Sequence, residues 1–318
     1  MVVKQLTYTN LDNGWGIDRV EGSVSGKERD AFAGLCTASN ISEPIYAFDI
    51  NKGYYVLSYC SPYGTDTFGR PRTYTHGYLL PMTDADMLFK NSGVLLGIDY
   101  FVSNTQDKLV PLKENLAEFK EKFSADEYAE LIECVYEAVT SRKSLEILSG
   151  ETDRIHFIKK VMSTVYDYFP LSLKKFITFS TNASGRTVNA VSAFSGNADI
   201  TYDFENKKAQ GITGFCSEFV KMLFTDKKDY YLTQLEKKLF VYTDREVASY
   251  STWQVFTNET RLYRYYEIHD GEGKFPSVIY CVGADETIFD SILVDKLLMP
   301  MDYEWVQLKH GIAFYTAR

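Results

Sequence analysis

The chain has 318 residues and a formal net charge of −9, and 45% of its residues are hydrophobic, which is typical of a globular fold. An acidic chain repels the nucleic-acid backbone, and its short lysine pairs lie beside Asp or Glu, so we expect no nucleic-acid partner. No apolar run approaches the roughly twenty residues that span a bilayer, and the N-terminus is polar from Lys4 onward, so we expect a cytoplasmic protein with no membrane span.

The first third of the chain is predicted to be rich in β-strands, because apolar and polar residues alternate in runs of Tyr, Thr, Val and Ile. We assign residues 1–108 to a strand-rich N-terminal domain. The predicted strands cover residues 4–9, 45–50, 54–60, 73–80 and 97–103, and short helices are predicted over 27–38 and 83–91.

A helical region follows. Ser124 and Glu127 have the spacing of a capping box, and Phe123 and Tyr128 are placed as a hydrophobic staple for a helix that continues to Val139. A second apolar stripe predicts a helix over residues 152–169, which Pro170 ends.

The remainder alternates between strands and helices, and we assign residues 109–318 to a helical and mixed α/β region. Strands are predicted over 176–181, 188–194, 200–204, 277–282 and 305–308, and helices over 214–224, 228–240 and 286–299. The predicted fold is therefore α+β, with a strand-rich N-terminal part, a helical middle and a mixed α/β C-terminal part.

Residues with chemical potential gather in the segment 65–81. Gly69 and Pro71 predict a loop between a strand over 54–60 and a strand over 73–80. The segment therefore predicts a long β-hairpin that carries a Gly/Arg loop at its tip.

The side chains around this loop allow several roles. Arg70 and Arg72 can clamp a phosphate or a carboxylate, although loop arginines are more often simply solvated. On a strand, Tyr74, His76 and Tyr78 share one face. His76 can act as an acid or base, or as a half-buried imidazole bonded to a neighbour. The predicted binding residues are Arg70, Arg72, Tyr74 and His76, and the catalytic candidates for an enzyme are His76 and Tyr74.

Metal and thiol chemistry find little support in the sequence. The five cysteines are widely spaced and contain no CxxC pair, so we expect neither a disulfide framework nor a zinc site, and we expect no cofactor. A nucleophilic dyad of Cys60 and His76 is conceivable on neighbouring strands, but a buried strand cysteine is the more common case.

Three short patterns along the chain point to one family. They are an opening strand at 5–9 followed by Gly14 and Gly16, a Gly-Arg-Pro turn at 69–71 followed by an aromatic-x-His strand at 74–76, and Phe169-Pro170 followed by a Thr-Phe-Ser-Thr strand at 178–181. They resemble the N-terminal region, and part of the middle region, of bacterial GTPase-associated proteins, which are encoded in conflict or defence gene clusters together with GTPases.

This resemblance implies a context and not a reaction. The function that it favours is a non-enzymatic interaction or adaptor module in a bacterial GTPase-linked defence-type system, with a GTPase or another product of the same gene cluster as the protein partner. Two alternatives stay open. One is a hydrolase or nucleotide-processing enzyme centred on Arg70, Tyr74 and His76, and the other is a sensor of a small anionic ligand that uses the same arginines.

Overall fold

The computed structural model describes most of the first 238 residues and five short strands beyond them. The described residues are 3–11, 14–36, 41–81, 85–112, 117–124, 127–141, 143–182, 186–191, 197–214, 216–238, 254–257, 263–267, 277–281, 303–309 and 312–317. They confirm the predicted α+β fold. None of the helices in this part of the chain combines the length and the apolar character needed to cross a membrane.

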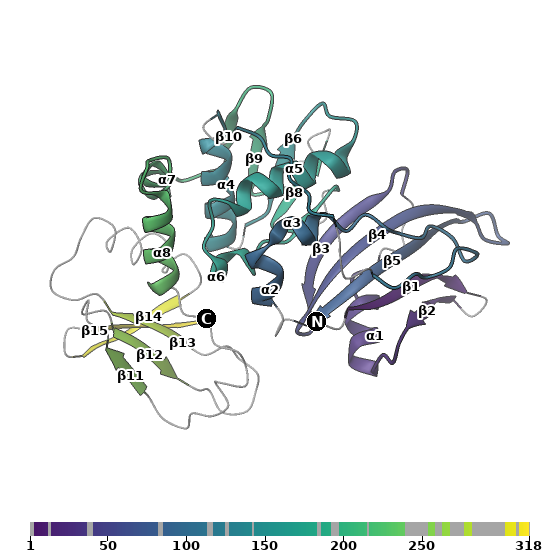
Figure 1. The fold of residues 1–318 in the computed structure, drawn as a ribbon, viewed down its shortest axis with the longest axis horizontal. Coiled ribbons are helices and arrows are strands. Elements are labelled where there is room, and N and C mark those ends of the chain that lie inside the picture. The colour runs from purple at the N-terminus through teal and green to yellow at the C-terminus, as the bar shows by residue number, and fades with distance from the viewer. Residues whose placement is uncertain are drawn as a thin grey trace.

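One ten-stranded mixed sheet organises the chain up to residue 210, in the order β10-β9-β6-β8-β7-β3-β4-β5-β1-β2 (Figure 1). The pairs β7–β8, β8–β6 and β6–β9 are parallel, and the others are antiparallel. Its strands are β1 (Lys4–Leu11), β2 (Gly14–Glu21), β3 (Ile45–Asn51), β4 (Tyr54–Thr65), β5 (Pro71–Pro81), β6 (Leu145–Leu148), β7 (Phe179–Ser180), β8 (Val188–Val191), β9 (Ile200–Asp203) and β10 (Lys208–Gln210).

The sheet crosses residue 108, where the predicted domain boundary lies. Ala47 and Phe48 of β3 pair with Ser180 and Phe179 of β7, so strands from before and after that residue belong to one sheet. Arg186, at the start of β8, also forms an ion pair with Asp49 of β3 across this junction.

The structure describes eight helices. They are α1 (Gly26–Ala33), α2 (Ala85–Lys90), α3 (Ser92–Leu96), α4 (Ala129–Ser141), α5 (Arg154–Tyr166), α6 (Leu171–Lys174), α7 (Ser217–Leu223) and α8 (Lys228–Lys238). Those from α2 to α7 contribute to the core on one face of the sheet. Helix α5 lies between β6 and β8 in the sequence and provides the crossover that a parallel strand pair requires.

The main core joins the sheet to these helices. The ring of Phe48 on β3 stacks on Tyr55 and Phe179, with ring centroids 5.3 and 5.6 Å apart, and meets Phe89 of α2 edge-on. Tyr166 of α5 meets the other side of Phe89. The high aromatic content of the chain is thus used largely in packing the interior.

Helix α1 packs on the opposite face of the sheet, against β2, β4 and β5. Ser25 caps it, and Glu28 completes a capping box, while Gly34 ends it at Ala33, five residues before the end predicted from the sequence. Phe32 of this helix packs directly over Gly77 of β5 in a small second core.

Several predicted elements are confirmed and others are corrected. The hairpin formed by β4 and β5 is confirmed, with Tyr54 paired to Pro81 and Tyr59 to His76. The contact between Phe123 and Tyr128 is also present, with ring centroids 5.4 Å apart, although α4 begins only at Ala129. The prediction of a strand over residues 97–103 is wrong, because these residues form neither a strand nor a helix. Strands β2 and β6 were not predicted.

The last described strands form two small antiparallel units. β11 (Gln254–Thr257), β12 (Tyr263–Glu267) and β13 (Ser277–Cys281) form a three-stranded sheet, and β14 (Tyr303–Lys309) and β15 (Ile312–Ala317) form a hairpin. β13 and β14 agree with the strands predicted over 277–282 and 305–308, whereas the helix predicted over 286–299 lies outside the described residues.

The packing of Phe32 on Gly77 generates the first prediction. A Cβ atom at position 77 would lie 2.5 Å from Cε2 of Phe32 and 3.0 Å from the carbonyl oxygen of Leu57. Gly77→Ala should therefore lower the free energy of unfolding by about 1–3 kcal/mol, the usual cost of overpacking. Urea unfolding of both proteins measures the difference.

The matched control is Gly26→Ala, where an added Cβ meets nothing within 4 Å. The double variant Gly77→Ala/Phe32→Leu should recover part of the loss, because a shorter side chain can yield space to the new methyl group. Equal stability of Gly77→Ala and the wild type would contradict this account of the α1 contact.

Candidate functional site

Residues 97–112, which we name the cover segment, cross the sheet face opposite α1 as an irregular stretch between α3 and α4. Side chains of the surrounding elements hold its main chain. The Tyr78 hydroxyl donates to the carbonyl of Tyr100 at 2.6 Å, and Lys159 of α5 donates to the carbonyl of Ile98 at 3.3 Å. Because these main-chain groups bond to side chains, they do not need a strand ladder, which explains why the predicted strand is absent.

His76 lies at the centre of this contact and is completely buried. Its Nδ1 accepts a hydrogen bond from the main-chain N–H of Val102 at 3.1 Å, so this nitrogen carries no proton. Its Nε2 lies 3.1 Å from Oε1 of Gln5, and in the neutral imidazole it donates there. Gln5 in turn donates to the carbonyl of Val110 at 2.8 Å and to Glu21. The neutral ring is therefore one link in a chain of bonds.

Burial and charge both keep His76 neutral. Desolvation is the main cause, and the positive charge of Arg19 adds to it, so the pKa of His76 falls from 6.5 to about 4. With both ring nitrogens engaged, this histidine is a structural group in the described conformation. Any substrate would reach it only after the cover segment moved.

A β-bulge supplies the second part of the polar network. In the β1–β2 pair, Leu6 is opposite Val20 and Tyr8 is opposite Ile17, so Thr7 faces two residues of β2. Bulges of this kind redirect a side chain. Here Asp18 and Arg19 both reach the face beneath the cover segment.

Asp18 and Arg19 together connect the strands with the cover segment. The Tyr74 hydroxyl donates to Oδ2 of Asp18 at 3.0 Å, and it accepts a hydrogen bond from Arg19. The Arg19 guanidinium also donates to the carbonyl of Asn104 at 2.9 Å and to the carbonyl of Asp107. Desolvation first, and then the charge of Asp18, raise the pKa of Tyr74, so this phenol remains protonated at neutral pH.

The β4–β5 turn is fixed by one carboxylate. Oδ1 of Asp66 accepts from the main-chain N–H of Phe68 at 2.8 Å and of Arg70 at 2.9 Å, and Oδ2 accepts from Nε of Arg70 at 2.6 Å. Gly69 completes the turn with φ = +76°. Partial desolvation opposes ionisation of Asp66, but the bonds from Arg70 and Phe68 outweigh it and lower the pKa of this carboxyl.

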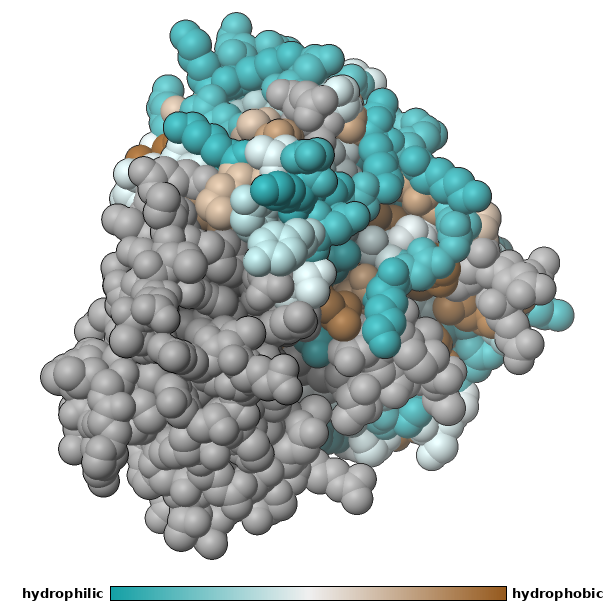
Figure 2. Space-filling view, turned by 60° about the vertical axis from the view of Figure 1, so that its left-hand side comes forward, coloured by the Kyte–Doolittle hydropathy of each residue, from teal (hydrophilic) through white to brown (hydrophobic). Residues whose placement is uncertain are grey.

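This rigid turn displays an aromatic side chain to solvent. Phe68 is 82% exposed, the largest exposed fraction among the large hydrophobic side chains in the described part of the chain. The guanidinium of Arg70 lies 5.3 Å from the centre of its ring, in a cation–π arrangement. On the face that Figure 2 shows, the coloured surface is mainly hydrophilic and hydrophobic residues show only in small groups. Phe68 is thus an exposed aromatic side chain that an ordered turn holds in place.

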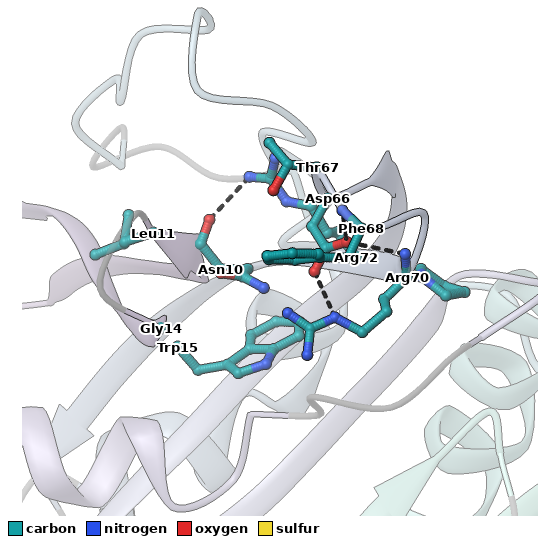
Figure 3. A pocket seen from close by; sticks show the side chains of 10 residues that line it. Asn10, Leu11, Gly14, Trp15, Asp66, Thr67, Phe68, Arg70 and Arg72 are labelled. Atoms are coloured by element: carbon teal, nitrogen blue, oxygen red, sulfur yellow. Dashed lines mark hydrogen bonds and ion pairs between the residues drawn. The ribbon is translucent and has the colours of Figure 1, made fainter.

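A pocket of about 610 Å³, which we name the hairpin pocket, lies between this turn and the adjoining ends of β1 and β2. Figure 3 shows the Trp15 indole and the Arg70 guanidinium extending into it from the two sides. Arg72 donates to the carbonyl of Asn10 at 2.9 Å, and this bond joins the walls. The pocket is lined by Asn10, Leu11, Gly14, Trp15, Asp66, Thr67, Phe68, Arg70, Pro71 and Arg72.

The structure divides the four predicted binding residues into two groups. Arg70 and Arg72 line the hairpin pocket, and the side chain of Arg70 is 69% exposed. Tyr74 and His76 are buried under the cover segment and line no part of that pocket.

The Cys60–His76 dyad is excluded by the strand register. Cys60 is opposite Thr75, and His76 is opposite Tyr59, so the thiol and the imidazole point to opposite faces of the sheet. No group of three or more His, Cys, Asp or Glu side chains among the described residues is placed to hold a metal ion.

Sequence reasoning overlooked the other side of the pocket and the bulge. Trp15, between Gly14 and Gly16, was the available signal, since an isolated tryptophan flanked by glycines is unusual in a plain strand. Asp18 and Arg19 gave no signal, because a bulge depends on the partner strand. A scan against models of protein families found no match to the chain, and a search of curated proteins found none either.

The low pKa of His76 predicts an acid-sensitive fold. In the unfolded chain the imidazole binds a proton near pH 6.5, whereas the folded protein resists protonation down to about pH 4. The contribution of His76 to stability is therefore complete above pH 6.5 and falls as the pH is lowered towards 4. The shift corresponds to about 3 kcal/mol, and chemical unfolding at several pH values measures it.

The control for this prediction is His76→Gln, which retains an amide that can bond to Val102 and Gln5 but does not titrate. Other carboxylates titrate in both proteins, so the difference between the two pH profiles isolates the imidazole. Parallel profiles between pH 4 and 6.5 would contradict the assigned role of His76.

The bonds of Arg19 predict a local effect on the cover segment. Arg19→Met removes the donors to Asn104 and Asp107, and Asp18 loses its ion-pair partner. The free energy of unfolding should therefore fall by about 1–3 kcal/mol. Hydrogen exchange should become faster over residues 100–110, while α5 exchanges as in the wild type.

Arg29→Met on the exposed surface of α1 is the matched control and should change neither property. If amides of the cover segment stayed as protected in Arg19→Met as in the wild type, the cover segment would not depend on the bulge.

Proposed function

We propose that this protein is a non-enzymatic interaction or adaptor module that binds a protein partner through the β4–β5 turn and the hairpin pocket. The observation that carries the proposal is the turn itself, where Asp66 fixes a conformation that keeps Phe68 82% exposed beside Arg70. Aromatic residues and arginine are enriched at protein interfaces, and an ordered loop loses little entropy when it binds.

The resemblance of the sequence to bacterial GTPase-associated proteins supports the choice of partner. On that basis the partner is a GTPase or another product of the same gene cluster, acting in a defence-type system. The acidic character of the chain as a whole makes the positive charge of Arg70 a local feature, suited to a partner that presents a carboxylate.

The enzyme alternative depends on Tyr74 and His76, which lie beneath the cover segment and are bonded within it. The anionic-ligand sensor has a specific observation in its favour, because both arginines line one pocket of about 610 Å³, a volume within the range of small-molecule sites. A sensor would show a higher melting temperature with its ligand, and Arg70→Ala would remove the increase.

The adaptor proposal predicts the outcome of affinity capture from the cells that encode the protein. Phe68→Ala/Arg70→Ala should lose the partner that the wild type retains, with a weakening of about tenfold or more, because two neighbouring contacts are removed. Mass spectrometry identifies the captured proteins, and circular dichroism verifies the fold.

The matched control is Tyr230→Ala/Arg29→Ala, which removes an exposed aromatic residue from α8 and an exposed arginine from α1. This control should capture the same partner as the wild type. Identical capture by the wild type and by Phe68→Ala/Arg70→Ala, or the absence of any specific partner, would refute the proposal.

A further inference from the structure

Strand β2 is one end of the ten-stranded sheet. Among the residues that the structure describes it pairs only with β1, and no main-chain hydrogen bond reaches its outer edge. Such an edge can pair with another strand, and natural proteins usually protect it. The β1–β2 bulge, with Asp18 and Arg19 turned under the cover segment, interrupts the regular edge after Ile17.

The regular part of the edge therefore extends from Gly14 to Ile17, which is roughly 13 Å of strand at about 3.3 Å per residue. Side chains shield it poorly. Gly14 and Gly16 have no Cβ, and a Cβ atom built at Gly14 would meet nothing within 4 Å. A Cβ atom at Gly16 would lie 3.4 Å from Cδ1 of Leu11, an ordinary contact distance. Gly14 is exposed and the next three residues are partly exposed, so this edge is the least shielded part of β2 for an incoming strand.

The same end of β2 opens into the hairpin pocket. Gly14 and Trp15 are lining residues of the pocket, and Arg70 reaches towards Trp15 from the other wall (Figure 3). A strand that paired with this edge would therefore carry its end towards the exposed ring of Phe68, the half-buried indole of Trp15 and a guanidinium.

We propose that an extended segment of a partner protein adds to β2 at Gly14–Ile17, antiparallel to it, and places a carboxylate on Arg70 and an apolar or aromatic side chain against Trp15 and Phe68. This inference rests on the proposed function and specifies the chemistry of its partner. Antiparallel addition brings the carboxyl-terminal end of the segment to Gly14, where the pocket lies.

Charge and geometry favour a carboxylate at that position. Nε of Arg70 bonds to Asp66, which holds the side chain in place, and the terminal nitrogens of a guanidinium form the donor pair that matches a carboxylate. The neighbouring Arg72 adds positive charge on the same side of the pocket. Because antiparallel addition brings the carboxyl-terminal end of the segment to Gly14, we assign this group to the terminal carboxylate of the partner segment.

The test uses the full chain and peptides of defined sequence, with fluorescence anisotropy as the readout. The first probe is a labelled Thr-Val-Thr-Val-Thr-Phe peptide with a free terminal carboxylate. The second ends in Phe-Asp-amide and supplies a side-chain carboxylate instead. The third probe is the first peptide with its terminal carboxylate replaced by an amide. The fourth is the free-acid peptide N-methylated at alternate residues, which cannot form the strand ladder.

We expect saturable binding of the free-acid probe, and weaker binding of the probe that ends in Phe-Asp-amide. Tighter binding of the Phe-Asp-amide probe would overturn the assignment to the chain terminus. Arg70→Gln should weaken binding of the free-acid probe about tenfold or more, as expected for the loss of a charge-assisted bond. Trp15→Leu should weaken it as well, whereas Arg29→Gln should bind like the wild type. The amide and the N-methylated probes should bind at least about tenfold more weakly.

Failure of both carboxylate probes to bind would overturn the inference. Unchanged binding by Arg70→Gln would overturn the role of the guanidinium, and equal binding of the N-methylated probe would overturn strand addition. If affinity capture still depends on Phe68 and Arg70 while no peptide binds, the adaptor function stands and only this inference fails. If capture fails too, both are refuted.

Discussion

The hydrogen bond from the main chain of Val102 to the buried imidazole of His76 is the contact on which the N-terminal half of the structure depends. It allows an irregular segment to cross a sheet face without leaving its main-chain groups unpaired in the interior. Because a main-chain N–H can only donate, the bond also fixes the protonation state of the ring. The covered face then stays neutral at His76, and the partly exposed Asp18–Arg19 pair lies beside it.

The bulge in the β1–β2 pair extends this network to the edge of the sheet. It turns two consecutive residues of β2 inwards, so half of the strand anchors the cover segment and the other half, up to Ile17, is left as a regular edge. One irregularity thereby separates the part of β2 that anchors the cover segment from the regular edge at Gly14–Ile17. The turn fixed by Asp66 forms the other wall of the hairpin pocket and holds Phe68 and Arg70 in defined positions, which would lower the entropic cost of the association that we propose.

Much of the fold could be predicted because it is encoded locally. The hairpin of β4 and β5 follows from alternation around Gly69 and Pro71, and α5 follows from its apolar stripe and from Pro170. The strand expected over 97–103 fails for a physical reason: its residues carry strand-like side chains, but their main-chain partners are His76, Tyr78 and Lys159 from distant positions. The short strand β6 was missed because a four-residue segment between helices, three of whose residues are apolar, is too short to show a periodicity of its own.

Composition and local residue patterns establish the acidic globular character, the α+β class, the hairpin and the presence of arginines at its tip. Contacts between distant segments place Arg70 and Arg72 in a pocket and bury Tyr74 and His76, although the four occupy every second position within seven residues. Alternation places residues on faces of a strand, but whether a face meets solvent depends on what packs over it. Here the cover segment, more than twenty residues away in the sequence, packs over the strand face that carries His76. Trp15 from another strand completes the hairpin pocket. Such contacts join residues that are remote in sequence, so no local pattern can reveal them.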